Sequence, residues 1–207
     1  MTYIALEGIK GTGKTTIMHR IMKSDIAHKL TCFPITAPLP PHDQLEKLFK
    51  GKSKLKENDA FIEQLFLHRA LVHHQNAIQT SRHLLGDRSI LTAIVTRWEK
   101  WNDPTFTIQR VLEQYKQIQK PNVYILLENP IEKSIENIAT RIAKPTGSND
   151  EKEDILIRAN EIYRTLLTEG EYSSKIGKAE IIRLDTNNDL NNISAEILEI
   201  IKHYIKK

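Results

Sequence analysis

The sequence predicts an α/β fold built on a five-stranded parallel sheet with helices on both faces. Short apolar runs that suit buried strands alternate with longer stretches whose apolar residues recur at helical spacing. Strands separated by helices pair in parallel, and helices then cover both faces of the sheet. A glycine-rich stretch between the first strand and the first helix points to the sheet edge where ligands bind in such folds.

Each element follows from a local signal. The run Tyr3–Leu6 is apolar and ends at the glycines, and Pro130 opens a helix because proline suits the first helical turn. The predicted strands are Tyr3–Glu7, Lys29–Phe33, His83–Gly86, Asn122–Leu127 and Glu180–Leu184. The predicted helices run from the glycines to about Lys23 and over about Gln44–Lys50, Asp59–Ser81, Ser89–Lys100, Phe106–Gln119, Pro130–Ile142, Glu153–Leu167 and Ile193–Ile205.

Length and composition favour a single domain over residues 1–207. Apolar residues make up 40% of the chain and charged residues 27%, which is typical of a protein with a sizeable buried core. No run approaches the roughly 20 apolar residues of a membrane span, and we see no signal peptide. The single cysteine, Cys32, fits a reducing compartment. We therefore expect a cytoplasmic protein without membrane contact.

The net charge of +4 does not by itself indicate a nucleic-acid partner. Much of the excess lies in lysines between Lys47 and Lys56, where Phe49 is the one aromatic residue, and at the C-terminus. Surfaces that bind nucleic acid usually combine clustered basic residues with aromatic residues that stack on bases. We expect no specific nucleic-acid partner.

A phosphate-binding motif follows the first strand. Residues 8–15 read Gly-Ile-Lys-Gly-Thr-Gly-Lys-Thr, the pattern G-x-x-x-x-G-K-[ST] between a strand and a helix. Its glycines let backbone N–H groups turn toward phosphate oxygens, and the next helix adds its positive N-terminal end. Lys14 would reach the β- and γ-phosphates, and Thr15 would hold Mg²⁺. The motif predicts ATP binding by Gly8, Ile9, Lys10, Gly11, Thr12, Gly13, Lys14, Thr15 and Thr16.

A charged pair, Asp87-Arg88, ends the third predicted strand. A carboxylate and a guanidinium at the end of a buried strand are costly unless they bind something. If this strand lies beside the first, Asp87 faces the Mg²⁺ held by Thr15, and Arg88 reaches toward a second phosphate. The alternatives are a structural ion pair or a cap on the helix that begins near Ser89.

These motifs, in this order, resemble thymidylate kinases. The resemblance rests on Glu7-Gly8 with the glycine loop, Asp87-Arg88, Arg69 midway along the long helix, a strand followed by Pro130 and a helix that ends at Arg141, and the tail Ile181–Thr186 before the closing helix. It implies a three-layer sandwich of the P-loop NTPase class with a mobile lid, ATP and Mg²⁺, and a homodimer. The implied activity is transfer of the ATP γ-phosphoryl group to a deoxynucleoside monophosphate, dTMP to give dTDP, in nucleotide biosynthesis.

The resemblance also implies roles for single residues. Arg69 and Arg88 would hold the phosphate or base of the acceptor, and Arg141 would swing onto the transferring phosphoryl group, because a guanidinium matches phosphate oxygens in two-point contact. For Arg69 and Arg141 a surface ion pair is the alternative. Catalysis is assigned to Lys14, Arg88 and Arg141, acceptor binding to Phe66, Arg69, Asp87, Arg88 and Arg97, and the metal to Thr15 and Asp87.

A polar segment, residues 142–153, is the expected lid. It contains Pro145 and Gly147 and separates two helices, so its closure would exclude water from the transfer step, which Lys144 could assist. An ordinary helix–helix loop is the alternative.

The chain departs from the family at the acceptor site. Lys10 occupies the place of an acidic residue in the glycine loop, where it either adds charge near phosphate or points to water. The Arg-Glu-Pro expected after the second strand is absent, and Leu65 stands where a base-stacking aromatic is expected, with Phe66 next to it. Arg97, Trp98 and Trp101 either line an altered pocket or pack on a neighbouring helix.

Two other functions therefore remain open. A deoxynucleoside kinase has a similar acidic-Arg-Ser motif, but it needs a general base, which that family supplies as a glutamate that Thr31–Leu39 lacks. A nucleotide-binding P-loop protein without kinase activity is the other alternative.

Overall fold

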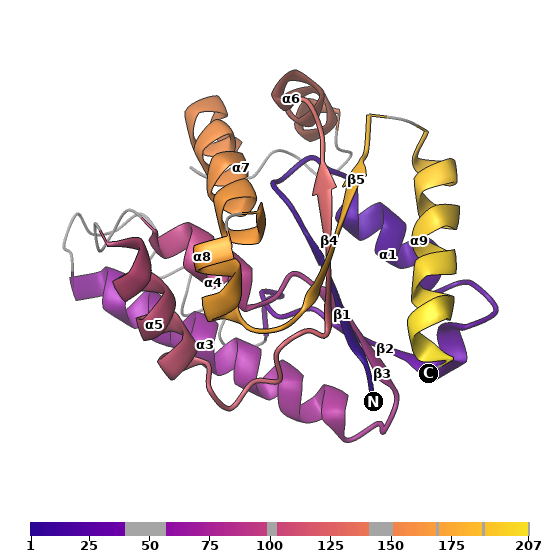
Figure 1. The fold of residues 1–207 in the computed structure, drawn as a ribbon, viewed down its shortest axis with the longest axis horizontal. Helices are drawn as coiled ribbons and strands as arrows, with labels where there is room; N and C mark the ends of the chain where they lie inside the picture. Colours follow the sequence, from indigo (N-terminus) through magenta and orange to yellow (C-terminus); the bar gives the residue numbers. More distant parts are fainter. Residues whose placement is uncertain (40–56, 99–102, 141–150, 169, 188, 207) are drawn as a thin grey trace.

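Five parallel strands form one sheet in the order β2-β3-β1-β4-β5 (Figure 1). The computed structural model describes residues 1–39, 57–98, 103–140, 151–168, 170–187 and 189–206. The strands are β1 (Tyr3–Glu7), β2 (Leu30–Phe33), β3 (His83–Asp87), β4 (Val123–Glu128) and β5 (Glu180–Asp185). The predicted α/β class, with its five-stranded parallel sheet, is confirmed.

Helices cover both faces of this sheet. In Figure 1, α1 and α9 lie on one side of the strands, and α3, α4, α5, α7 and α8 lie on the other. Alternate side chains of each strand feed the two core clusters, so in β1 Ile4 packs toward α1 and α9, whereas Tyr3 packs toward α4 and α5. The helices are α1 (Lys14–Ile21), α3 (Glu57–Ile78), α4 (Ile90–Arg97), α5 (Pro104–Gln114), α6 (Ile131–Ala139), α7 (Glu153–Thr168), α8 (Gly170–Ile176) and α9 (Leu190–Ile205), with a 3-10 turn at Ala27–Lys29.

Most of the predicted elements are present within a few residues. The central strands β1 and β4 are buried almost throughout, which is why their apolar runs could be recognised. Side-chain caps begin three of the described helices: Ser89 accepts a hydrogen bond from Leu91 N at α4, Asp103 from Phe106 N at α5, and Asp189 from Asn191 N at α9. The helix α8 was not predicted, and α5 and α6 end earlier than expected. The helix predicted near residues 44–50 lies outside the described residues.

The carboxyl ends of the strands meet at one edge of the sheet. Leu6 pairs with Asp87 across β1 and β3, and Glu7 pairs with Leu126 across β1 and β4. The third predicted strand therefore does lie beside the first. No helix among the described residues is long and apolar enough to cross a membrane.

Candidate functional site

The glycine loop joins β1 to α1 in a conformation that only glycine adopts easily. Gly8, Gly11 and Gly13 have φ values of 132°, 88° and 84°. Two of them also lack room for a side chain, because a Cβ at Gly8 would overlap the carbonyl oxygen of Leu127, and one at Gly11 would overlap that of Ser134. Glycines at these positions are therefore required both by the turn and by the packing of the loop on β4 and α6.

Lys14 lies buried at the centre of this loop. Its Nζ donates to the carbonyl oxygens of Gly8 and Ile9, at 2.8 and 2.6 Å, and to the hydroxyl of Thr12 at 3.0 Å. The first turn of α1 contains no acidic residue that would offset its positive end. An ammonium group next to a glycine-rich turn and a helix N-terminus suits an anion such as a polyphosphate.

Arg88 reaches the same loop from the end of β3. Its Nη1 lies 3.5 Å from the carbonyl oxygen of Gly8, and its backbone N–H donates to the carbonyl oxygen of Leu6 at 3.0 Å. Its φ of 71° is uncommon for a residue other than glycine, and such strain occurs often at functional sites. Lys14 and Arg88 thus place two positive charges around one carbonyl group at the start of the loop.

Asp87 and Thr15 lie on the same side of the sheet. Strand alternation places Asp87 with Leu85, on the face covered by α1, and the first turn of α1 carries the exposed Thr15. Their oxygens are of the kind that Mg²⁺ prefers. In the described ranges no three His, Cys, Asp or Glu side chains gather into a metal site. A divalent ion there would therefore depend on phosphate oxygens as further ligands.

Glu7, directly before the loop, is the polar centre of the site. Its fully buried carboxylate accepts hydrogen bonds from Ser89 Oγ at 2.5 Å, Tyr163 OH at 3.0 Å and Thr92 Oγ1 at 3.2 Å. These bonds tie β1 to α4 and α7. Burial raises the pKa of Glu7, although the hydrogen bonds and the charges of Arg88 and Lys14 oppose the shift.

The raised pKa of Glu7 predicts the sign of a pH effect. A carboxyl whose folded pKa lies above its unfolded value stabilises the fold most below the unfolded pKa, and this stabilisation is lost as the pH rises through the folded pKa. The variant Glu7→Gln cannot ionise. We expect the free energy of unfolding of the wild type, minus that of the variant, to fall as the pH rises from below 4.5. Urea unfolding at a series of pH values measures this difference, and a flat or rising difference would contradict the prediction.

A cavity of about 340 Å³ adjoins these residues. It lies between α3, α4 and the segment after β2, and Ser89 and Thr92, which both bond to Glu7, form part of its wall. Most of the lining is apolar. The lining residues are Ile35, Thr36, Ile62, Glu63, Phe66, Ala70, Ser89, Thr92, Ala93, Thr96, Arg97 and Tyr115.

Two of the predicted acceptor residues, Phe66 and Arg97, line this cavity. Arg69 does not. It is buried on α3, with its guanidinium carbon 5.2 Å from the centre of the Phe66 ring, so it is not a surface ion pair. Trp98 also lies outside the wall and packs edge-on against Tyr172 of α8, with 5.8 Å between ring centres. Arg141, Lys144 and Trp101 lie outside the described residues, as do residues 142–150 of the expected lid.

Lys10 points across the loop to the residues before α7. Its Nζ lies 3.4 Å from Oε1 of Glu151, a carboxylate that is only 9% exposed. Glu151 belongs to the segment predicted as a lid. An ion pair thus joins the glycine loop to the end of that segment, a contact that neither interpretation of Lys10 from the sequence had included.

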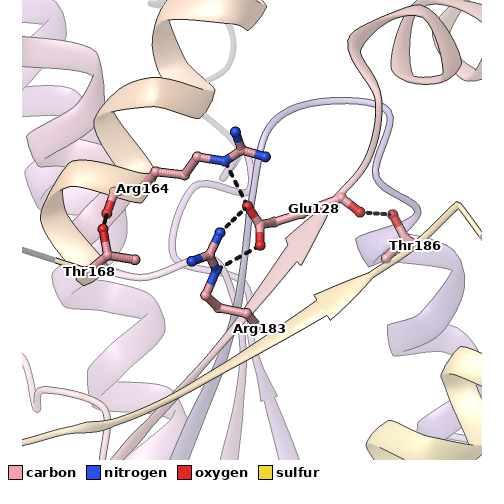
Figure 2. A network of polar contacts seen from close by, with 5 residues as sticks. All are labelled: Glu128, Arg164, Thr168, Arg183 and Thr186. Carbon is pink, nitrogen blue, oxygen red and sulfur yellow. Dashed lines mark hydrogen bonds and ion pairs between the residues drawn. The ribbon is translucent and has the colours of Figure 1, made fainter.

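A second charged cluster anchors α7 to the sheet (Figure 2). Glu128, at the end of β4, accepts two hydrogen bonds from Arg183 of β5, at 2.7 and 2.9 Å, and one from Arg164 of α7 at 2.8 Å. Thr186 bonds to the backbone carbonyl of Glu128 at 2.8 Å. The hydrogen bonds from Arg183 hold the pKa of Glu128 below its usual range.

For Glu128 the expected pH effect has the opposite sign to that for Glu7. A lowered folded pKa stabilises the fold above the unfolded pKa, and this stabilisation is lost as the pH falls through the folded pKa. We expect Glu128→Gln to cost about 1 kcal/mol at neutral pH, because both arginines are about half exposed to solvent, and less in acid. Glu113→Gln, which removes an exposed ion pair with Lys116, is the control and should change little. Equal losses in the two variants would rule out an anchoring role.

Several residues of this site were not predicted. Glu63 and Ile62 precede Phe66 by three and four positions and Ala70 follows it by four, so they share its helix face, a signal that could have been recognised in the sequence. Tyr163 and Tyr115 come from distant helices, and no local pattern connects them to the loop.

Comparison of the chain with family models finds no match, and comparison with curated proteins finds none either. Any assignment of function to this chain therefore depends on its own residues and their geometry.

Proposed function

We propose that this protein is a kinase of the P-loop NTPase class that transfers the γ-phosphoryl group of ATP to a nucleoside monophosphate. The observation that carries the proposal is the junction between the glycine loop and the cavity. Ser89 and Thr92 line the cavity and also bond to Glu7, the residue directly before the loop. A donor phosphate on the loop and an acceptor in the cavity would thus be neighbours at the carboxyl edge of the sheet.

The charges at this junction suit phosphoryl transfer. This reaction requires positioning and charge neutralisation more than covalent chemistry, and Lys14 and Arg88 both lie at the carbonyl group of Gly8. Mg²⁺ bound at Thr15 and Asp87 would neutralise further phosphate charge. Arg141 keeps its predicted role on the transferring group, and dTMP, the acceptor that the resemblance implies, is the first acceptor to test.

The position of Glu63 supports a monophosphate over a nucleoside as acceptor. A nucleoside hydroxyl needs a general base near the donor phosphate, whereas a monophosphate brings its own oxyanion. Among the described residues that line the cavity, Glu63 is the one carboxylate. It is paired with Arg97, which lies eight positions after Ser89 at the far end of α4. A carboxylate at that end is badly placed to serve as the base. Glu7 is nearer the loop, but it is fully buried outside the cavity wall, and its carboxylate already accepts hydrogen bonds from Ser89, Thr92 and Tyr163.

The test is ADP release from Mg·ATP with dTMP, dUMP, dCMP, dGMP, dAMP, UMP, CMP or thymidine, with the products identified by mass. Stimulation by one or more monophosphates supports the proposal. Stimulation by thymidine alone would establish the deoxynucleoside kinase instead. If ATP binds and no acceptor in the panel is phosphorylated, the protein belongs with nucleotide-binding proteins that lack kinase activity.

A further inference from the structure

Two charged side chains lie in the wall of an otherwise mostly apolar cavity. Glu63 of α3 and Arg97 of α4 both line it, with 3.7 Å between Oε1 of Glu63 and Nε of Arg97. Arg97 is only 5% exposed. Buried charges of this kind are expensive for the fold, so their retention in a ligand cavity suggests a binding role.

The pair lies at the end of the cavity away from the glycine loop. Ser89 caps α4 beside Glu7, and Arg97 is the last residue of the helix, eight positions later. At the rise of an α-helix this separation is about 12 Å. A nucleoside monophosphate has a comparable length. With its phosphate at Ser89 and Arg88, its base would reach Glu63 and Arg97.

Arg97 retains hydrogen-bonding capacity at this position. The 3.7 Å contact with Glu63 is too long for a hydrogen bond, and Nη1 of Arg97 bonds to nothing in the described part of the chain. The guanidinium carbon lies 5.6 Å from the centre of the Tyr115 ring, a cation–π contact that helps to hold the side chain in the cavity wall. The pair therefore places a carboxylate acceptor next to a guanidinium whose Nη1 has no hydrogen-bond partner among the described residues.

We propose that Glu63 and Arg97 read the edge of the acceptor base and select a cytosine nucleotide, an inference that rests on the proposed kinase function. Glu63 accepts from the exocyclic amino group, and Arg97 donates to the ring nitrogen and the carbonyl oxygen beside it, a pairing that matches all three groups on the edge of cytosine. Thymine and uracil carry a carbonyl oxygen in place of the amino group, so they would turn an acceptor toward the carboxylate. Phe66 supplies a face for stacking, and a volume of about 340 Å³ is at the small end of ligand pockets, which favours a pyrimidine over a purine.

Calorimetric titration of the full chain with dCMP, dTMP, dUMP and dGMP, without ATP, tests the selection directly. We expect dCMP to bind about tenfold or more tightly than the other three. In Glu63→Gln the new amide can donate to a carbonyl oxygen, so the ratio of dCMP to dTMP affinity should fall about tenfold. Glu113→Gln, the same change at an exposed ion pair, should leave that ratio unchanged.

The outcomes separate this inference from the kinase proposal. Equal binding of dCMP and dTMP by the wild type, preference for dGMP, or an unchanged ratio in Glu63→Gln each overturns the base selection, even if some monophosphate is phosphorylated. Selective binding of dCMP that depends on Glu63, without phosphoryl transfer from ATP, supports the selection and overturns the kinase. If Glu63→Gln does not fold, as judged by circular dichroism, the double variant Glu63→Gln/Arg97→Gln keeps the cavity neutral. Loss of the dCMP preference in that double variant supports the selection, and a retained preference overturns it.

Discussion

Replacing Lys14 with glutamine is expected to reduce phosphoryl transfer about a thousandfold while the fold remains. The ammonium group donates hydrogen bonds to loop atoms, the carbonyl oxygens of Gly8 and Ile9 and the hydroxyl of Thr12. Glutamine can still donate to one of these groups, but it brings no charge to the phosphates. Loss of one preorganised charged donor at a transferring group costs on the order of 10³ in kcat/KM, equivalent to about 4 kcal/mol.

This effect is measured as ADP release with the best acceptor of the panel, alongside thermal unfolding. The matched control is Lys116→Gln, which removes an exposed lysine whose partner is Glu113. We expect the control to keep wild-type turnover and both variants to unfold near the wild-type temperature. Substantial turnover by Lys14→Gln would show that the loop is not where the phosphoryl donor binds.

Replacing Gly11 with alanine is expected to damage both stability and nucleotide binding. The residue has a φ of 88°, and an added Cβ would overlap backbone atoms of Ser134, which cannot move without shifting α6. Asn137 also donates to the carbonyl oxygen of Gly11, at 2.8 Å, so a shift of the loop would break this contact. Strain together with a backbone clash should cost about 3 kcal/mol in the free energy of unfolding.

The variant Gly177→Ala is the control, because it introduces backbone strain without a steric clash. Gly177 has a φ of 122°, at least as unfavourable for alanine, but an added Cβ would meet only the flexible side chain of Lys120, at 3.8 Å. We expect this control to lose stability through strain alone and to bind ATP as the wild type does. Equal loss of stability in both variants, with ATP affinity unchanged in each, would show that α6 does not restrain the loop.

The fold could be predicted well because its signals are local. The strands β1, β3 and β4 are buried on both faces, so each appears in the sequence as an apolar run with a polar residue at its end. The helix α8 was missed because it is only seven residues long and begins at Gly170, which local propensity does not favour in a helix. The early end of α6 at Ala139 was missed for a similar reason, because no proline or glycine at that position indicates a helix end.

The candidate site could be predicted only in part. Features formed by neighbouring residues were recognised, whereas contacts between residues far apart in the sequence were not. The glycine loop occupies eight consecutive residues, so its backbone geometry and its lysine follow from one stretch of chain. The carboxylate Glu7 was noticed only as the residue before the loop. Its hydrogen-bond donors come from residues 82, 85 and 156 positions away.

The sequence by itself determined the strand–loop–helix unit, the parallel sheet and the edge where charged strand ends gather, because periodicity, glycine geometry and strand direction act over short stretches of chain. Only the tertiary structure decided that Arg97 is buried beside Glu63 in a cavity, that Trp98 is excluded from it, and that Lys10 meets Glu151. Those pairings depend on how α3, α4 and α7 pack on the sheet. The same charged side chains would lie equally well in water if these helices were rotated, so no local pattern could reveal them.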